Sequence, residues 1–251
     1  MTVKEKNKSK EVVKKNDFER VPTGIPGLDE LIQGGFVKGS TVLVTGTTGT
    51  GKTTFCAQYL LEGLKRGEPC IYITLEEKPY NLKENLKSVG FDLEKYEKQG
   101  LLKIIYQSPS EVSAATSSIA RVINSFSPKR LVIDPISILT LHLKDPIAIR
   151  NYLIQMIDEI KKIGTTTLMV SEILESDIDE EGRGKLSRDG IVEFVVDGVI
   201  VLHYLNIGRE SFGNIQIRKM RRTKHAHGWF PYNITESGIS VMKEETSALL
   251  R

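Results

Sequence analysis

The chain has 251 residues and a formal net charge of +3, with 27% charged and 39% hydrophobic residues. This length can bury a substantial core as one α/β domain, and no long low-complexity segment is present. No apolar run has the length of a signal-peptide core or a transmembrane helix, so we expect a cytoplasmic protein that does not enter a membrane. The two cysteines, Cys56 and Cys70, belong to no metal-type cluster, and we expect both to be reduced and buried.

The net positive charge lies at the N-terminus. Residues 1–20 hold seven Lys or Arg and four Asp or Glu, so this segment accounts for the whole excess. We expect residues 1–17 to form a flexible basic arm and residues 18–251 to form a single domain. An arm that binds nucleic acid is the alternative, which the interspersed acidic residues disfavour.

Helices and strands alternate along the chain after a short helix that ends at Gly34 and Gly35. We expect strands at residues 41–45, 70–75, 101–106, 130–134 and 165–171, and helices at residues 54–61, 80–89, 112–126 and 146–163. Alternation of apolar strands with helices is typical of a parallel sheet covered on both faces. The sequence therefore predicts an α/β fold with a parallel central sheet flanked by helices.

The pattern changes after the last of these strands. Residues 175–189 are polar, first acidic and then basic, and we expect a long mobile loop there. Apolar runs separated by turn residues follow at 199–205, 215–220, 229–234 and 238–242. These runs predict an antiparallel C-terminal β extension of the sheet.

Residues 46–53 read GTTGTGKT and match the phosphate-binding motif G-x-x-x-x-G-K-[ST]. The glycines allow a tight turn whose amide groups point inward, and the following helix adds the positive end of its dipole. Lys52 would neutralise the β- and γ-phosphates, and the Thr53 hydroxyl would bind Mg²⁺. A turn that merely joins strand to helix is the alternative. The expected phosphate contacts come from Gly46, Thr47, Thr48, Gly49, Thr50, Gly51, Lys52, Thr53 and Thr54.

Acidic residues follow two of the expected strands. Asp134 follows an apolar run and predicts a magnesium-binding carboxylate beside Thr53, with a helix cap as the alternative. Glu76 and Glu77 close the strand after the phosphate-loop helix. Neighbouring side chains on a strand point to opposite sides, so one of the two carboxylates would face the phosphates and polarise the attacking water. An ordinary solvated turn is the alternative for this pair.

Taken together, these motifs resemble the RecA/RadA superfamily and, more closely, the KaiC-like ATPases. The supporting segments are residues 22–29 (PTGIPGLD), 74–77 (TLEE), 88–91 (SVGF) and 219–225 (KMRRTKH). The resemblance covers nearly everything from about residue 18 onward. It implies a RecA-like P-loop NTPase core that binds ATP with Mg²⁺ between the subunits of a homohexameric ring.

The resemblance also assigns residues far from the phosphate loop. Lys219 and Arg221 would reach the γ-phosphate of the neighbouring subunit's ATP. The other positions implied to contact nucleotide are Ser88, Met220, Thr223, His225, Thr235 and Glu236. Arg222 departs from the family, which usually has Gly there, and this departure bears on the backbone around Thr223 and His225.

The residues around Arg221 support the same interpretation independently. Lys219, Arg221, Arg222 and Lys224 crowd positive charge into one short segment, which is costly unless an anion neutralises it. A solvated basic edge is the alternative. His225 and His227 form an H-x-H pair without an evident third metal ligand.

Three functions remain open from the sequence. The leading hypothesis is a Mg²⁺-dependent ATPase that acts as a homohexamer, and regulatory protein partners are left open. The second is a nucleotide-gated scaffold in which turnover is incidental. The third is a DNA-dependent recombinase or motor, which the acidic residues of the 175–189 segment disfavour.

Overall fold

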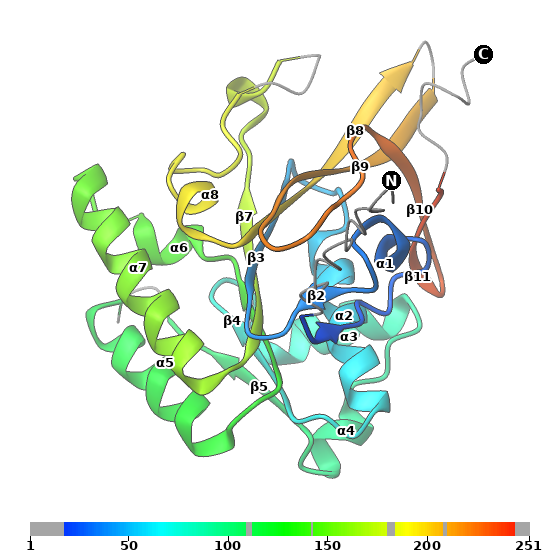
Figure 1. Ribbon diagram of the computed structural model, residues 1–251. Coiled ribbons are helices and arrows are strands. Elements are labelled where there is room, and N and C mark those ends of the chain that lie inside the picture. The colour runs from blue at the N-terminus through cyan, green and yellow to red at the C-terminus, as the bar shows by residue number, and fades with distance from the viewer. Residues whose placement is uncertain (1–17, 109–111, 142, 180–183, 208–209, 244–251) are drawn as a thin grey trace, which may run out of the picture.

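The computed structural model describes residues 18–108, 112–141, 143–179, 184–207 and 210–243 (Figure 1). The expected basic arm at residues 1–17 lies outside the described residues. Within the described part, a sheet of nine strands runs in the order β11-β10-β9-β8-β3-β7-β6-β4-β5. Its strands are β3 (Thr41–Gly46), β4 (Cys70–Thr74), β5 (Leu102–Tyr106), β6 (Arg130–Asp134), β7 (Thr166–Glu172), β8 (Gly198–Ile207), β9 (Glu210–Met220), β10 (Phe230–Thr235) and β11 (Gly238–Val241).

The six strands from β8 to β5 pair in parallel, whereas β9, β10 and β11 continue the sheet antiparallel. The predicted α/β fold with an antiparallel C-terminal extension is therefore confirmed. A separate pair, β1 (Arg20–Val21) and β2 (Phe36–Val37), is also antiparallel. The helices are α1 (Leu28–Leu31), α2 (Lys52–Lys65), α3 (Pro79–Ser88), α4 (Glu94–Lys98), α5 (Val112–Phe126), α6 (Ser137–Thr140), α7 (Pro146–Ile163) and α8 (Val192–Val195).

Two hydrophobic cores lie on opposite faces of the sheet, because successive side chains of a strand point in opposite directions. On β3, Val42 and Val44 join the core under α2, α3 and α4, whereas Leu43 joins the core under α5, α6 and α7. Figure 1 shows α5 and α7 (green) on one side of the sheet and α2 to α4 (blue to cyan) on the other. Since helices cover both faces of the sheet, the predicted site lies in the loops at the carboxyl ends of the parallel strands.

Cys56 and Cys70 are both free and buried, as the sequence predicts. Among the helices of the described residues, we find none that is both long and apolar enough to cross a membrane.

Two sequence-based expectations differ from the structure. β4 ends at Thr74, so Glu76 and Glu77 lie in the bend after the strand and the prediction that they close it is wrong. The described part of the 175–189 segment is not a featureless loop. It contains a 3-10 helix (Glu175–Asp177), and Ile178 forms a bridge with Gly184.

Candidate nucleotide-binding site

The phosphate-loop motif connects β3 directly to α2. Gly49 and Gly51 have φ angles of 81° and 87°, in the left-handed region that favours glycine. Gly51 is also the N-cap of α2, so the first amide groups of a 14-residue helix face the loop. From β10, the Tyr232 hydroxyl donates to the Thr50 carbonyl at 2.7 Å and supports the loop from outside. The loop therefore leads directly into α2 and is supported by β10.

Lys52 lies folded over this loop. Its Nζ donates to the carbonyl oxygens of Gly46 at 3.0 Å and Thr47 at 2.7 Å. Burial lowers the pKa of Lys52, and the negative charges of Glu172 and Asp134 oppose that effect. A phosphate group at the loop would offer the ammonium stronger, charged acceptors than these two carbonyls.

Thr53 and Asp134 come together at the start of α2 and the end of β6. Thr53 Oγ1 donates to Asp134 Oδ2 at 3.1 Å, and the Tyr72 hydroxyl donates to the same oxygen. Burial raises the pKa of Asp134, whereas the hydrogen bonds from Tyr72 and Thr53 lower it. A hydroxyl and a carboxylate oxygen at this spacing are the hard oxygen donors that Mg²⁺ prefers, so the pair fits the predicted metal.

Glu76 and Glu77 lie close to Asp134 but in different surroundings. Glu76 is exposed, and its charge raises the pKa of Asp134. The Glu77 carboxylate accepts a hydrogen bond from Asn85 Nδ2 at 2.5 Å, and its backbone is bonded to the Thr74 hydroxyl. Burial, with smaller effects of Asp134 and Glu76, raises the pKa of Glu77. Glu77 is therefore held in place by its neighbours, whereas Glu76 faces solvent beside the loop.

The sequence interpretation missed Glu172 and Arg188. β7 lies between β3 and β6, and its last residue, Glu172, pairs with Gly46 of the phosphate loop. The negative charge of its carboxylate raises the pKa of Lys52. The same carboxylate accepts a hydrogen bond from Arg188 Nη1 at 3.4 Å. A signal was available, because Glu172 follows an apolar strand in the same way as Asp134 does.

Ser88, Thr235 and Glu236 lie at the same end of the sheet as the loop. A Cβ on Gly90 would lie 2.4 Å from the Glu236 carbonyl oxygen, so the turn after α3 touches the β10–β11 turn. The Ile234 side chain in turn lies against Gly51. A cleft of about 480 Å³ is lined by Gly90 and Glu236 at the first of these two contacts. Thr235 and Glu236 therefore follow a residue that contacts the phosphate loop of the same chain, and Ser88 precedes the turn that contacts Glu236.

The remaining predicted residues lie at the opposite end of β3. Met220 pairs with Gly198, which itself pairs with Val42 near the start of β3. The phosphate loop begins at Gly46, four residues further along β3 and roughly 13 Å away at 3.3 Å per residue. The members of this remote group are Lys219, Met220, Arg221, Thr223 and His225. Within one chain, the structure does not bring them to the phosphate loop.

A β-bulge sets the direction of Lys219. Lys219 pairs with Val199 and Ile217 pairs with Ile200, which leaves Arg218 as an extra residue in β9. Without the bulge, Lys219 would share the core face of Ile217; with it, Lys219 turns to the face of α8. There its Nζ donates to the carbonyls of Val196 at 2.6 Å and Glu193 at 3.1 Å. Burial lowers the pKa of Lys219, and the positive charge of Arg221 lowers it further.

Arg222 has a φ of 57°, which explains physically why glycine suits this position. The Arg20 guanidinium fixes the turn, donating to the Arg222 carbonyl at 3.1 Å and to Thr223 Oγ1 at 2.7 Å. The Arg222 guanidinium lies over the Phe18 ring, 5.3 Å from its centroid. This departure from the family therefore keeps the backbone conformation that glycine would adopt.

The rings of His225 and His227 lie with their centroids 4.7 Å apart and their planes tilted by 56°. His225 Nδ1 lies 2.8 Å from the carbonyl oxygen of Ala226. In the part of the chain that the structure describes, no group of three or more His, Cys, Asp or Glu could hold a metal ion. A cleft of about 710 Å³ next to this segment is lined by the positive groups Arg218, Lys219 and Arg221.

The sheet order, the phosphate-loop motif after β3 and the strand-end acids define a RecA-like α/β fold. The chain belongs to the KaiC ATPase family, whose model, described as "ATPase: KaiC", matches residues 21–246. Membership supports ATP binding and ATPase activity in general terms. A solved structure, the KaiC-like protein PH0186 of the hyperthermophilic archaeon Pyrococcus horikoshii, is 42% identical with a TM-score of 0.80. It is matched over 90% of this chain and 100% of that one.

Some curated relatives are about as long as this chain, and others are about twice as long. A UPF0273 protein of Aeropyrum pernix is 32% identical over 90% of this chain and 95% of its own length. The circadian clock protein KaiC3 of Synechocystis is 30% identical over 90% of this chain but only 46% of its own length. The chain thus spans about half the length of the clock proteins it matches.

Proposed function

We propose that this protein binds ATP with Mg²⁺ and hydrolyses it at sites shared between neighbouring copies in a homohexameric ring. The observation that carries the proposal is the separation of the predicted site residues to the two ends of β3. The phosphate loop lies at one end, and Lys219 and Arg221 lie at the other. One copy alone therefore holds only part of the predicted site.

The half at the phosphate loop has the groups needed for binding. Lys52 and the amide groups at the start of α2 would hold the phosphates, and Thr53 and Asp134 would hold Mg²⁺. The metal, when bound, supplies positive charge that stabilises the phosphate oxygens during transfer. Glu76, exposed beside this pair, would orient and deprotonate the attacking water. Ser88, Thr235 and Glu236 would contact the base and ribose of the bound nucleotide.

The other half has cations whose present partners are weak. Lys219 is bonded to uncharged carbonyl groups, and the Arg221 guanidinium is 53% exposed. Both would bind a neighbour's γ-phosphate more strongly than their present acceptors, as arginine fingers do. Met220, Thr223 and His225 belong to the same segment and would contact that nucleotide.

A ring follows from this polarity. When complementary surfaces lie at two different places on one chain, copies associate head to tail, and such contacts form either a closed ring or an open filament. The resemblance to KaiC-like ATPases supports six copies in a closed ring. Free, buried Cys56 and Cys70 are compatible with the reducing compartment that we propose, the cytoplasm.

The DNA-dependent motor receives little support from the 175–189 segment. In its described part, Lys185 pairs with Asp177 at 3.3 Å and Arg188 pairs with Glu172 at 3.4 Å. These cations already neutralise acids of the same chain and offer less charge to a phosphate backbone. Measuring ATP turnover with and without single-stranded DNA separates the two activities, and a protein without any turnover would favour the nucleotide-gated scaffold.

The test of the shared site mixes two inactive variants. Arg221→Ala should fold and bind ATP but lose most turnover, and Glu76→Gln should do the same for a different reason. In mixed rings, some interfaces pair an intact Glu76 with an intact Arg221, so activity should return above that of either variant alone. If subunits exchange and no activity returns, Arg221 does not act on a neighbouring site and the proposal is wrong.

A further inference from the structure

Asp197, directly before β8, has a buried carboxylate that contacts three separate parts of the fold. Its side chain is 7% exposed. Oδ2 accepts from the Thr41 backbone N–H at 3.0 Å, at the start of the strand that leads to the phosphate loop. The same oxygen lies 2.8 Å from Lys161 Nζ on α7. Oδ1 lies 3.6 Å from Arg221 Nη1.

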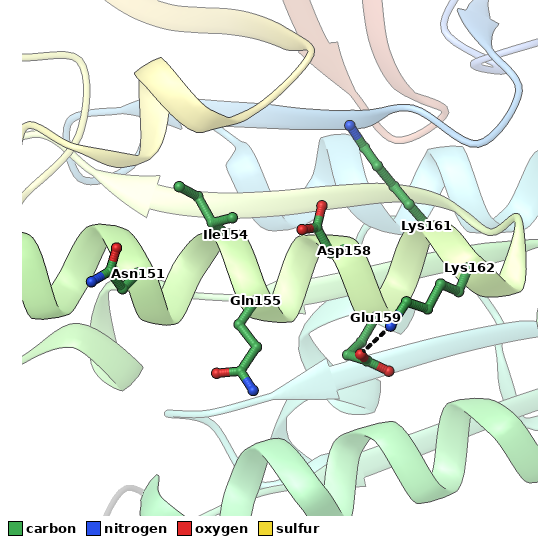
Figure 2. A pocket seen from close by; sticks show the side chains of 7 residues that line it. All are labelled: Asn151, Ile154, Gln155, Asp158, Glu159, Lys161 and Lys162. Carbon is green, nitrogen blue, oxygen red and sulfur yellow. Dashed lines mark hydrogen bonds and ion pairs between the residues drawn. The ribbon is translucent and has the colours of Figure 1, made fainter.

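Lys161 reaches this carboxylate from the outer helix. A hollow of about 660 Å³ lies along α7. Among the side chains that line it, Lys161 extends to the opposite side of the helix from Glu159 and Lys162 (Figure 2). Lys162 pairs with Glu159 on the helix surface, whereas Lys161 pairs with Asp197. Burial alone would raise the pKa of Asp197, but the bonds from Lys161 and the Thr41 N–H hold that pKa below its ordinary value. The carboxylate is therefore charged and well satisfied without Arg221.

Arg221 is tied to the same residue in two ways of different strength. Its backbone N–H donates to the Asp197 carbonyl at 2.9 Å, which fixes the position of the Cα atom. The contact between its guanidinium and the Asp197 carboxylate is longer, at 3.6 Å, and the Arg221 side chain is 53% exposed. Because this contact is long and the guanidinium is open to solvent, its charged end can leave the carboxylate while Lys161 stays bound there. The backbone is held while the charged end remains available.

We propose that Asp197 is the positioning residue of Arg221, which it orients toward the neighbouring copy's phosphates. This inference rests on the shared-site function proposed above and adds a residue to it. Lys161 makes the shorter contact with the carboxylate, at 2.8 Å against 3.6 Å for Arg221. Arg221 is therefore oriented by Asp197 but remains able to leave it. When a neighbour's phosphate arrives, the guanidinium exchanges a shared carboxylate for a more highly charged acceptor.

The test is Asp197→Asn, which keeps an oxygen for the Thr41 N–H and removes the charge. Turnover should fall about five- to tenfold, with the ATP affinity of the phosphate loop changed less than twofold. In an Arg221→Ala background the same substitution should cause no further loss, because its effect passes through Arg221. Lys162→Met is the matched control: it removes the ion pair with Glu159 on the surface of α7, which does not involve Asp197, and should keep turnover within about twofold of the unmodified protein.

Subunit mixing places Asp197 on one side of the interface. Asp197→Asn copies retain their own phosphate loop and Glu76, so mixing them with Glu76→Gln copies should restore activity. If the Arg221→Ala mixture regains activity and the Asp197→Asn mixture does not, only this inference is wrong. If neither mixture regains activity, the shared site itself is wrong. Equal losses in both Arg221 backgrounds, or unchanged turnover, would also overturn it.

A second variant covers the case in which Asp197→Asn does not fold, which thermal unfolding would show. Asp197→Glu keeps the charge for Lys161 and displaces the oxygen that faces Arg221. It should lower turnover at least twofold and regain activity in the same mixture with Glu76→Gln. A folded Asp197→Glu variant with full turnover would contradict the positioning role.

Discussion

Thr53 Oγ1 donates a hydrogen bond to Asp134 Oδ2 at 3.1 Å, although the two residues are 81 positions apart in the chain. β7 separates the strands that lead to them, so the contact is made above the edge of the sheet. In KaiC-type folds as in any parallel sheet, loops at the carboxyl ends of the strands share one edge. The pair fixes where a divalent cation would be held.

Asp134→Asn should therefore remove the Mg²⁺-dependent part of ATP affinity. The amide keeps the hydrogen bond from Thr53 but lacks the negative charge that binds a hard cation. ATP titrations by calorimetry, with and without Mg²⁺, should show an at least tenfold gain from Mg²⁺ in the unmodified protein and little gain in the variant. Asp158→Asn, on the exposed face of α7, is the control. A variant with full Mg²⁺ dependence would remove Asp134 from the metal site.

Lys52→Ala tests the phosphate loop itself. Lys52 now binds two carbonyl groups of the loop and would move to the phosphates, where charge-assisted bonds are worth about 1.5–3 kcal/mol. Affinity for ATP should fall at least tenfold. Lys65→Ala, at the far end of the same helix, should bind ATP normally. Unchanged binding by Lys52→Ala would refute the assignment of the loop.

Glu76→Gln and Glu77→Gln should differ in their effect on turnover. Glu76 is exposed beside the metal pair, whereas Glu77 is held by Asn85. Loss of the base in Glu76→Gln should slow hydrolysis by about 10²-fold or more while ATP affinity holds. Glu77→Gln should slow it much less, since an amide oxygen can still accept from Asn85. The reverse order in single-turnover measurements would make Glu77 the base.

The architecture could be predicted from the sequence, because short apolar runs that form strands alternate with segments whose apolar residues recur at helical spacing. The helix predicted over residues 146–163 is an example, because the observed α7 has the same bounds. In the structure, the Asp145 side chain caps its N-terminus and Gly164 ends it in a left-handed conformation. Local signals of this kind are short-range and do not depend on the partner strand.

The site was harder to predict where it depends on pairing between strands. The direction of Lys219 is set by the bulge at Arg218, which exists only in register with β8. The end of β4 at Thr74 depends on a hydrogen bond between the Thr74 hydroxyl and the Glu77 backbone. Glu172 ends an apolar strand, as Asp134 does, but its place beside the phosphate loop depends on the insertion of β7 between β3 and β6, which the sequence does not show. These relationships depend on tertiary contacts, which cannot be predicted from local patterns in a single sequence.

Arg222 allows a test of backbone strain. A non-glycine residue with φ of 57° costs about 1 kcal/mol or more, and glycine relieves this but loses more freedom on folding, about 0.5–1 kcal/mol. Arg222→Gly should thus change the free energy of unfolding by less than about 1 kcal/mol. Arg222→Val should destabilise the fold by about 1–2 kcal/mol, because a β-branched side chain is poorly tolerated there. Urea unfolding of both variants, with Arg222→Ala as reference, measures this; equal stability of Gly and Val would exclude strain at this turn.

His203 should make stability depend on pH. Its ring packs against Trp229 with centroids 4.5 Å apart, and its buried Nε2 has no hydrogen-bond partner in the described part of the chain. Burial, aided by the positive charge of Arg218, lowers the pKa of His203 from 6.5 to about 4. As the pH falls below 6.5, His203 is protonated in the unfolded chain but stays neutral in the folded one. The contribution of His203 to the free energy of unfolding is therefore fully present above pH 6.5 and is lost as the pH falls towards 4.

The largest loss that this one group can cause is roughly 3 kcal/mol, at 1.36 kcal/mol per pH unit. His203→Phe keeps an aromatic ring against Trp229 and removes the titration, so its free energy of unfolding should fall less between pH 7.5 and pH 5 than that of the unmodified protein. Urea unfolding at the two pH values measures the difference, and His227→Gln, at an exposed position, should behave like the unmodified protein. An identical pH dependence in His203→Phe would show that His203 is not buried in its neutral form.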